Sequence, residues 1–299
     1  MRATVMAAVA ATALAVASTR AAGGDDSSTR ISVFVSVLPQ AYFVERVGGE
    51  DVSVQTLVGP GQSPHTFEPT PRQVADLSDA RLYFTIGMPF EKVLVEKIRA
   101  AFPNVEIVDM RAGVTLRENA EDGDGREPDP HVWLSPLIAK MLAGNVAAAL
   151  ERVAPAERGR FEANLAAFDG DLDAVNARIA SALAPLRGRD FFVYHPAFGY
   201  FGDAYGLKQV AVEVEGKEPS AKQLADLIHR ARAANVRVIF VQPQFSARNA
   251  EAVAEAIGGA VVPMDPLAGD YLANLEKMVT LIEKALTGEG GRAEKSSGK

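Results

Sequence analysis

One long helical stretch at residues 156–186 divides the sequence into two halves of similar pattern. Its apolar residues recur at three- and four-residue steps, and about 30 helical residues span roughly 45 Å. A helix of that length can run along a whole two-lobed body, so we expect one long rigid connector between two lobes. On both sides of it, short β-rich runs alternate with helical patterns, which is typical of α/β folds with mostly parallel sheets. The expected strands are 31–37, 52–58, 81–86 and 105–109 before the stretch and 191–194, 209–214, 236–241 and 260–264 after it.

Two ten-residue segments that lie 150 residues apart indicate that the two lobes are related. Residues 68–77 and 218–227 share Glu, Pro, Gln, Ala, Asp and Leu at equivalent positions. In each, Thr70 or Ser220 precedes a helical pattern with Gln three residues later, as in a capping box. The alternative is that the two segments are similar only because helix capping favours the same residue types at both helix starts. The expected organisation is an N-terminal lobe at 30–155, the connecting helix at 156–186, a C-terminal lobe at 187–287 and a disordered tail at 288–299.

The N-terminus has the pattern of a secretory signal peptide. Arg2 precedes an uncharged apolar run over residues 5–18, and small residues follow it up to residue 22. The run is too short for a bilayer span, which needs about 20 residues. We therefore expect residues 1–22 to be cleaved and the mature protein to be periplasmic, with a disordered N-terminus as the alternative. Because no cysteine follows the run, we expect no lipid anchor.

Charge and cysteine content exclude several classes of function. Lys and Arg number 31 against 38 Asp and Glu, a net charge of −7, so no general basic field is available to bind a nucleic acid. The sequence contains no cysteine, which excludes disulfide scaffolds, thiolate metal sites and cysteine nucleophiles. Any bound metal must therefore be held by His, Asp, Glu or neutral oxygen ligands.

The four histidines differ in their sequence settings. His195 directly follows an expected strand, His65 lies in the Gly/Pro-rich loop after another, and His131 precedes an expected helix. Asp265 follows the last expected strand. Ligands of open α/β sheets bind beyond the carboxyl ends of strands, so these groups could meet between the lobes on a four-coordinate ion such as Zn²⁺. Independent helix caps, turn histidines and a buried hydrogen-bonded pair are the alternatives, and His229, inside a helical pattern, is expected to be structural.

The 150-residue offset also relates His65 to Glu215, in the loop after an expected strand of the second half. Glu215 is therefore a candidate accessory carboxylate that faces the same cleft. The alternative is a solvated loop charge.

Five short segments form a joint pattern along the chain: PHTFEPTP at 64–71, YFTIGMPFE at 83–91, DPHVWL at 129–134, YHPAFGYF at 194–201 and DPL at 265–267. Their order over residues 31–286 resembles that of the zinc/manganese solute-binding proteins of ABC transporters. The resemblance implies a long helix between two lobes and a metal ion held by His65, His131, His195 and Asp265. Manganese-type relatives typically place a carboxylate where this chain has His195, so the resemblance favours zinc. Imidazole ligands favour zinc over manganese as well.

The loop at 111–129 departs from this resemblance. Many zinc-type relatives carry a histidine-rich loop, whereas this loop is acidic and contains no histidine. We expect a mobile surface loop.

The expected function is capture of Zn²⁺ outside the cytoplasm and its delivery to a membrane ABC permease, by a monomer that is not an enzyme. Uptake of Mn²⁺ or Fe²⁺ by the same architecture is the nearest alternative. A secreted zinc hydrolase is a more distant one, because the chain lacks an H-E-x-x-H helix and Asp265 would fill the open coordination position. The third alternative is a metal-free binding module for a larger solute.

Overall fold

Each half of the chain forms a four-stranded parallel sheet. The structure is a computed structural model that describes residues 30–118, 128–213 and 220–287. The sheets have the orders β2-β1-β3-β4 and β6-β5-β7-β8, so corresponding strands occupy the same places in both. The strands are β1 (Ile31–Val35), β2 (Val52–Thr56), β3 (Leu82–Thr85), β4 (Glu106–Asp109), β5 (Asp190–Val193), β6 (Lys208–Ala211), β7 (Val238–Val241) and β8 (Ala260–Pro263). The expected two-lobed α/β fold is confirmed.

The apolar content of each strand matches its place in the sheet. The central strands β3 and β7, with sequences LYFT and VIFV, are buried along their whole length. Such continuous apolar runs are typical of parallel strands covered on both faces. The edge strand β2, with sequence VSVQT, instead exposes Ser53 and Gln55, so one of its faces meets solvent.

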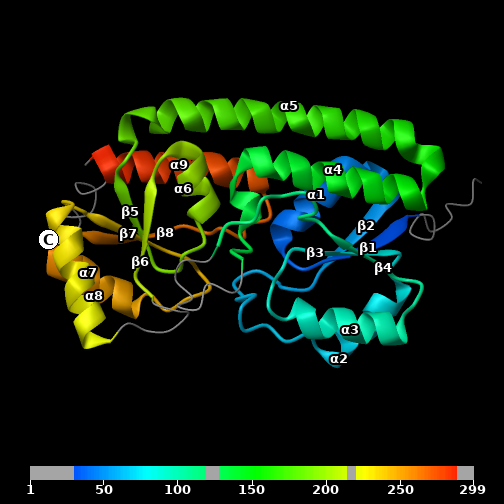
Figure 1. Cartoon of the computed structure of the whole chain (residues 1–299), viewed down its shortest axis with the longest axis horizontal. Helices are drawn as coiled ribbons and strands as arrows, with labels where there is room; N and C mark the ends of the chain where they lie inside the picture. Colours follow the sequence, from blue (N-terminus) through cyan, green and yellow to red (C-terminus); the bar gives the residue numbers. More distant parts are fainter. Residues whose placement is uncertain (1–29, 119–127, 214–219, 288–299) are drawn as a thin grey trace, which may run out of the picture.

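Helices cover both faces of each sheet (Figure 1). They are α1 (Leu38–Gly48), α2 (Pro71–Asp76), α3 (Glu91–Ala101), α4 (Pro136–Val153), α5 (Arg158–Leu183), α6 (Gly199–Tyr205), α7 (Ala221–Ala233), α8 (Arg248–Ile257) and α9 (Tyr271–Thr287). Alternate residues of β1 enter different cores: Val33 and Val35 join the core beneath α1, α4 and α5, while Phe34 packs on the side of α3. The first of these cores continues without interruption into the second lobe, as far as Ile282 of α9.

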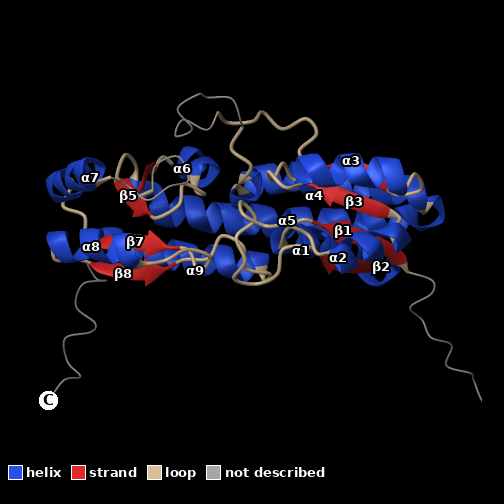
Figure 2. Ribbon diagram, turned by 90° about the horizontal axis from the view of Figure 1, so that it is seen from below, coloured by secondary structure: helices blue, strands red, loops and turns tan. Residues whose placement is uncertain are grey.

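Helix α5 connects the two lobes. It runs above α4 and α9 across both sheets in Figure 1, and Figure 2 shows the sheets at opposite ends of the molecule. Its 26 residues correspond to about 39 Å. The buried side chains lie on one face, which packs against α1, α4 and α9: Phe161, Phe168, Leu172, Val175, Ile179 and Leu183.

The ends of α5 differ slightly from the expected range 156–186. Short 3₁₀ turns at Pro155–Glu157 and Ala184–Leu186 flank the α-helix, and each contains a proline. Proline at these positions favours tight turns at helix ends and cannot continue the hydrogen-bond ladder. The short helix α6 was not predicted from the sequence.

Some expectations fall on residues outside the described ranges. They are the signal peptide at 1–22, the tail at 288–299, Glu215 and most of the acidic segment of the loop at 111–129. Among the described helices, none combines the length and apolar composition that a membrane span requires.

Candidate metal centre

Three histidines from separate segments meet between the two lobes. His65 lies in the loop that links β2 to α2, and His131 directly precedes a 3₁₀ turn at Val132–Leu134. His195 comes two residues after the end of β5, in the other lobe. One nitrogen of each ring lies within 4.8 Å of the corresponding atoms of the other two. The structure therefore brings together the three histidines that the sequence singled out.

The distances between these nitrogens match those of a zinc site. Nε2 of His131 is 3.3 Å from Nε2 of His65 and 3.3 Å from Nε2 of His195. Two ligands that bind zinc at 2.0 to 2.1 Å with tetrahedral angles are about 3.3 Å from each other. The ring centroids of His65 and His195 are 4.6 Å apart. The three rings can therefore coordinate one small ion with little rearrangement.

Two buried carboxylates orient two of the rings. Oδ1 of Asp129 lies 2.7 Å from Nδ1 of His131 and also accepts the backbone N–H of that residue. Oε1 of Glu213 lies 2.5 Å from Nδ1 of His195. Asp129 and Glu213 are only 3% and 4% exposed, so neither carboxylate is simply a solvated charge. Each holds the proton of its histidine on Nδ1, which leaves the Nε2 lone pair free for a metal.

These two carboxylates were missed as functional residues by the sequence reasoning. Asp129 had a local signal, because it stands two residues before His131 within a recognised segment. Glu213 offers only its place after a strand, close to the candidate residue Glu215. Its pairing with a histidine 18 residues away depends on parallel β5 and β6 lying side by side.

Burial lowers the pKa of two of the site histidines, His65 and His195. The pKa of His65 is lowered from 6.5 to about 2, mainly by burial and further by the nearby rings of His131 and His195. The pKa of His195 is also lowered, because desolvation outweighs the opposing effect of Glu213. Only an unprotonated imidazole nitrogen can bind a metal, so these shifts favour metal binding at neutral pH.

The loop after β7 fixes His195. The side chain of Gln242 accepts the backbone N–H of His195 through Oε1 at 3.1 Å and donates to its carbonyl oxygen through Nε2 at 2.8 Å. The ring of Phe245 stacks on the imidazole, with centroids 4.8 Å apart. His195 is thus held by its backbone, by its Nδ1 atom and by one ring face.

Asp265, the expected fourth ligand, lies outside the group of three histidines. It follows β8, as expected, and its Oδ1 accepts hydrogen bonds from Nε2 of Gln244 at 2.8 Å and from the backbone N–H of Leu267 at 2.9 Å. His229 is exposed on α7 and is not part of the group of three histidines. The position of Glu215 is not among the described residues.

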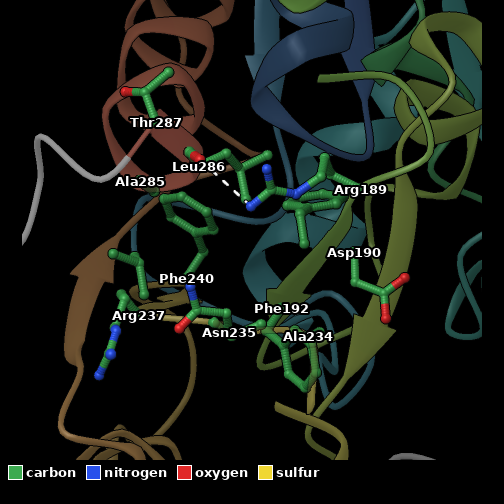
Figure 3. A pocket seen from close by; sticks show the side chains of 13 residues that line it. Arg189, Asp190, Phe192, Ala234, Asn235, Arg237, Phe240, Ala285, Leu286 and Thr287 are labelled. Carbon is green, nitrogen blue, oxygen red and sulfur yellow. Dashed lines mark hydrogen bonds between the residues drawn. The ribbon is translucent and has the colours of Figure 1, made fainter. Parts of the chain in front are cut away.

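Two cavities show how the histidine cluster relates to the surface. One of about 490 Å³ reaches His65 and lies between its loop and α3. Another, of about 260 Å³, lies at the amino-terminal ends of β5 and β7 beside the end of α9 (Figure 3). There Nη2 of Arg189 donates to the carbonyl oxygen of Leu286 at 3.5 Å. The second cavity is at the opposite strand ends from His195 and is separate from the histidine cluster.

Comparison with solved structures places the chain among two-lobed proteins of this type. A crystal structure of ZnuA is 41% identical in sequence, with a TM-score of 0.82, over 86% of this chain and 99% of that one. The match therefore extends over the lobes and the connecting helix.

Curated relatives give consistent sequence matches. The high-affinity zinc uptake system protein ZnuA of Bacillus subtilis is 28% identical over 263 residues, which cover 82% of this chain and 81% of that protein. The zinc-binding lipoprotein AdcA of Streptococcus pneumoniae is 27% identical over 289 residues, or 89% of this chain. This match spans only 58% of the length of AdcA.

A family model covers most of the chain. The model described as zinc-uptake complex component A, periplasmic, matches residues 33–285, which include both sheets, α5 and all three histidines. The chain therefore belongs to the periplasmic zinc-uptake component A family.

Proposed function

We propose that this protein captures Zn²⁺ outside the cytoplasm and delivers it to the permease of an ABC transporter. One observation carries the proposal: Nε2 of His131 lies 3.3 Å from Nε2 of His65 and from Nε2 of His195, the separation of two ligands in a tetrahedral zinc site. The family match and the zinc-related names of the relatives support it.

The proposed ligands are His65, His131, His195 and, as the fourth, Asp265. Three neutral imidazoles and one carboxylate leave a residual charge near +1 on the bound ion. The group of three nitrogens favours Zn²⁺ over Mn²⁺, which prefers oxygen ligands. If Asp265 occupies the fourth position, no place remains for a catalytic water, which supports a binding protein over a zinc hydrolase.

The proposal extends to the form of the mature protein. Cleavage of residues 1–22 would leave a monomer in the periplasm, with lobes at 30–155 and 187–287 around the connector at 156–186.

Metal analysis and uptake measurements test the function. Protein isolated from its own compartment should contain zinc, and the metal-free chain should bind Zn²⁺ more tightly than Mn²⁺ in competition titrations. Cells that lack the protein should grow poorly when zinc is chelated and should recover with the wild-type chain but not with His131→Ala. Isolation with manganese instead, or normal growth of the deletion strain under chelation, would contradict the proposal.

A further inference from the structure

The carboxylate of Asp265 has one engaged and one unengaged oxygen. Oδ1 accepts two hydrogen bonds, from the side chain of Gln244 at 2.8 Å and from the backbone of Leu267 at 2.9 Å. Within the described part of the chain, Oδ2 has no hydrogen-bond or ion-pair partner. A carboxylate oxygen has two lone pairs, so the two N–H donors saturate Oδ1.

The backbone around Asp265 is independently fixed. Its carbonyl oxygen accepts a hydrogen bond from Nδ2 of Asn274 at 2.7 Å, and the carbonyl oxygen of the next residue, Pro266, accepts one from Nε1 of Trp133 at 2.8 Å. With the main chain held in this way, the two donors to Oδ1 determine how the carboxylate is rotated.

Gln244 belongs to the same loop that holds His195. Gln242 binds the backbone of His195 and Phe245 stacks on its ring, so Gln244 lies between two residues that contact a proposed ligand. This loop therefore fixes the position of Gln244 relative to His195. Its amide can restrain Asp265 in a constant relation to the metal centre.

The number of carboxylate oxygens that reach the metal affects which ion is preferred. A carboxylate binds a metal through one oxygen or through two. One oxygen added to three imidazole nitrogens gives four ligands, the number typical of zinc. Two oxygens would raise the coordination number and the fraction of ligand atoms that are oxygen, which suits Mn²⁺ better.

We propose that Gln244 is a specificity-determining residue: it engages Oδ1 of Asp265, restricts this side chain to a single metal-binding oxygen and so favours Zn²⁺ over Mn²⁺. The inference rests on the proposed zinc-capture function and adds a role for a residue outside the ligand set.

The test compares the full chain with Gln244→Met, which keeps most of the side-chain volume, and with Gln244→Ala. Gln223→Met is the matched control, because it removes a glutamine hydrogen bond of the same lobe at the N-terminus of α7. Zn²⁺ and Mn²⁺ affinities are measured by competition titration. Co²⁺ replaces zinc as a spectroscopic probe, since four-coordinate Co²⁺ absorbs visible light strongly and higher coordination weakens the band. Thermal unfolding of each metal-free variant verifies folding.

Both Gln244 variants are expected to reduce the preference for Zn²⁺ over Mn²⁺ about tenfold or more, the range typical of residues that orient a metal ligand. They should also weaken the Co²⁺ band, while Gln223→Met changes neither property. An unchanged preference and an unchanged band in both Gln244 variants, with a wild type that binds zinc, would overturn this inference and leave the proposed function standing. A wild type that binds no zinc and gives no strong Co²⁺ band would instead overturn the proposed function.

Discussion

Nε1 of Trp133 donates a hydrogen bond of 2.8 Å to the carbonyl oxygen of Pro266, which joins the segment after His131 to the segment after β8 in the other lobe. The indole is completely buried, and its own carbonyl oxygen accepts a hydrogen bond of 2.5 Å from the hydroxyl of Tyr271 in α9. The two lobes are thus connected by a direct polar contact close to His131, in addition to α5.

Replacement of Trp133 by Phe should destabilise the protein. The change leaves the buried carbonyl of Pro266 without its donor, which costs about 1 to 3 kcal/mol in the free energy of unfolding. Because Asp265 is the neighbour of Pro266, we also expect weaker zinc binding. Urea unfolding and zinc titration measure the two effects. Tyr205→Phe, which removes a hydrogen bond to Asn176 away from the site, should lower stability but leave zinc affinity unchanged. Wild-type stability of Trp133→Phe would contradict this account of the lobe contact.

Glu213→Gln should weaken zinc binding while the fold is kept. The amide oxygen can still accept the Nδ1 proton of His195, but the loss of charge makes the imidazole a poorer donor to the metal. Carboxylates in this position typically contribute about 10-fold to 100-fold to metal affinity. Competition with a chromogenic chelator gives the affinity. The control is Glu276→Gln, an exposed carboxylate of α9, and equal affinities in the two variants would argue against the orienting role of Glu213.

The two matched helix starts give a prediction about stability. Gln73 N–H donates to the hydroxyl of Thr70 at 3.2 Å, and Gln223 N–H donates to the hydroxyl of Ser220 at 3.4 Å. In return, the backbone N–H of Thr70 donates to Oε1 of Gln73, and that of Ser220 donates to Oε1 of Gln223. Both capping boxes expected from the sequence are therefore present. Thr70→Ala and Ser220→Ala should each cost about 1 kcal/mol of stability in urea unfolding. No loss in either variant would show that the caps contribute little.

The fold could be predicted to a large extent, because periodicity records burial along each segment. The all-buried runs of β3 and β7 and the one-sided apolar pattern of α5 are direct consequences of their surroundings. Segment ends were less predictable, since hydrogen bonds to neighbouring strands and turns decide them. Helix α6 was missed because its seven residues include two glycines and show too short a pattern.

The candidate site could be predicted only in part. Two histidines after expected strands and one before an expected helix could be named from local sequence, and the structure brings them together. The contacts of Glu213 with His195 and of Gln244 with Asp265 join residues 18 and 21 positions apart, and they depend on how strands and loops pack. Local sequence carries no direct signal for such contacts.

The metal-free protein should lose stability as pH falls below about 6.5. The folded-state pKa values of His65 and His195 are lowered by burial, His65 to about 2, whereas both titrate near 6.5 in the unfolded chain. Below that pH the unfolded state therefore binds protons that the folded state does not, at a cost of up to about 1.4 kcal/mol per pH unit for each histidine. Urea unfolding between about pH 7 and pH 5 should show this slope. His65→Ala should reduce the slope of the unfolding free energy against pH. An unreduced slope would contradict the lowering of the His65 pKa by burial.

The most direct test of the central claim is a zinc titration of the metal-free chain and of four single variants, His65→Ala, His131→Ala, His195→Ala and His229→Ala. If three imidazoles from two lobes hold one ion, each of the first three changes should weaken zinc binding at least about tenfold, and His229→Ala should bind like the wild type. Equal affinities in all four variants would contradict the assignment of the metal centre.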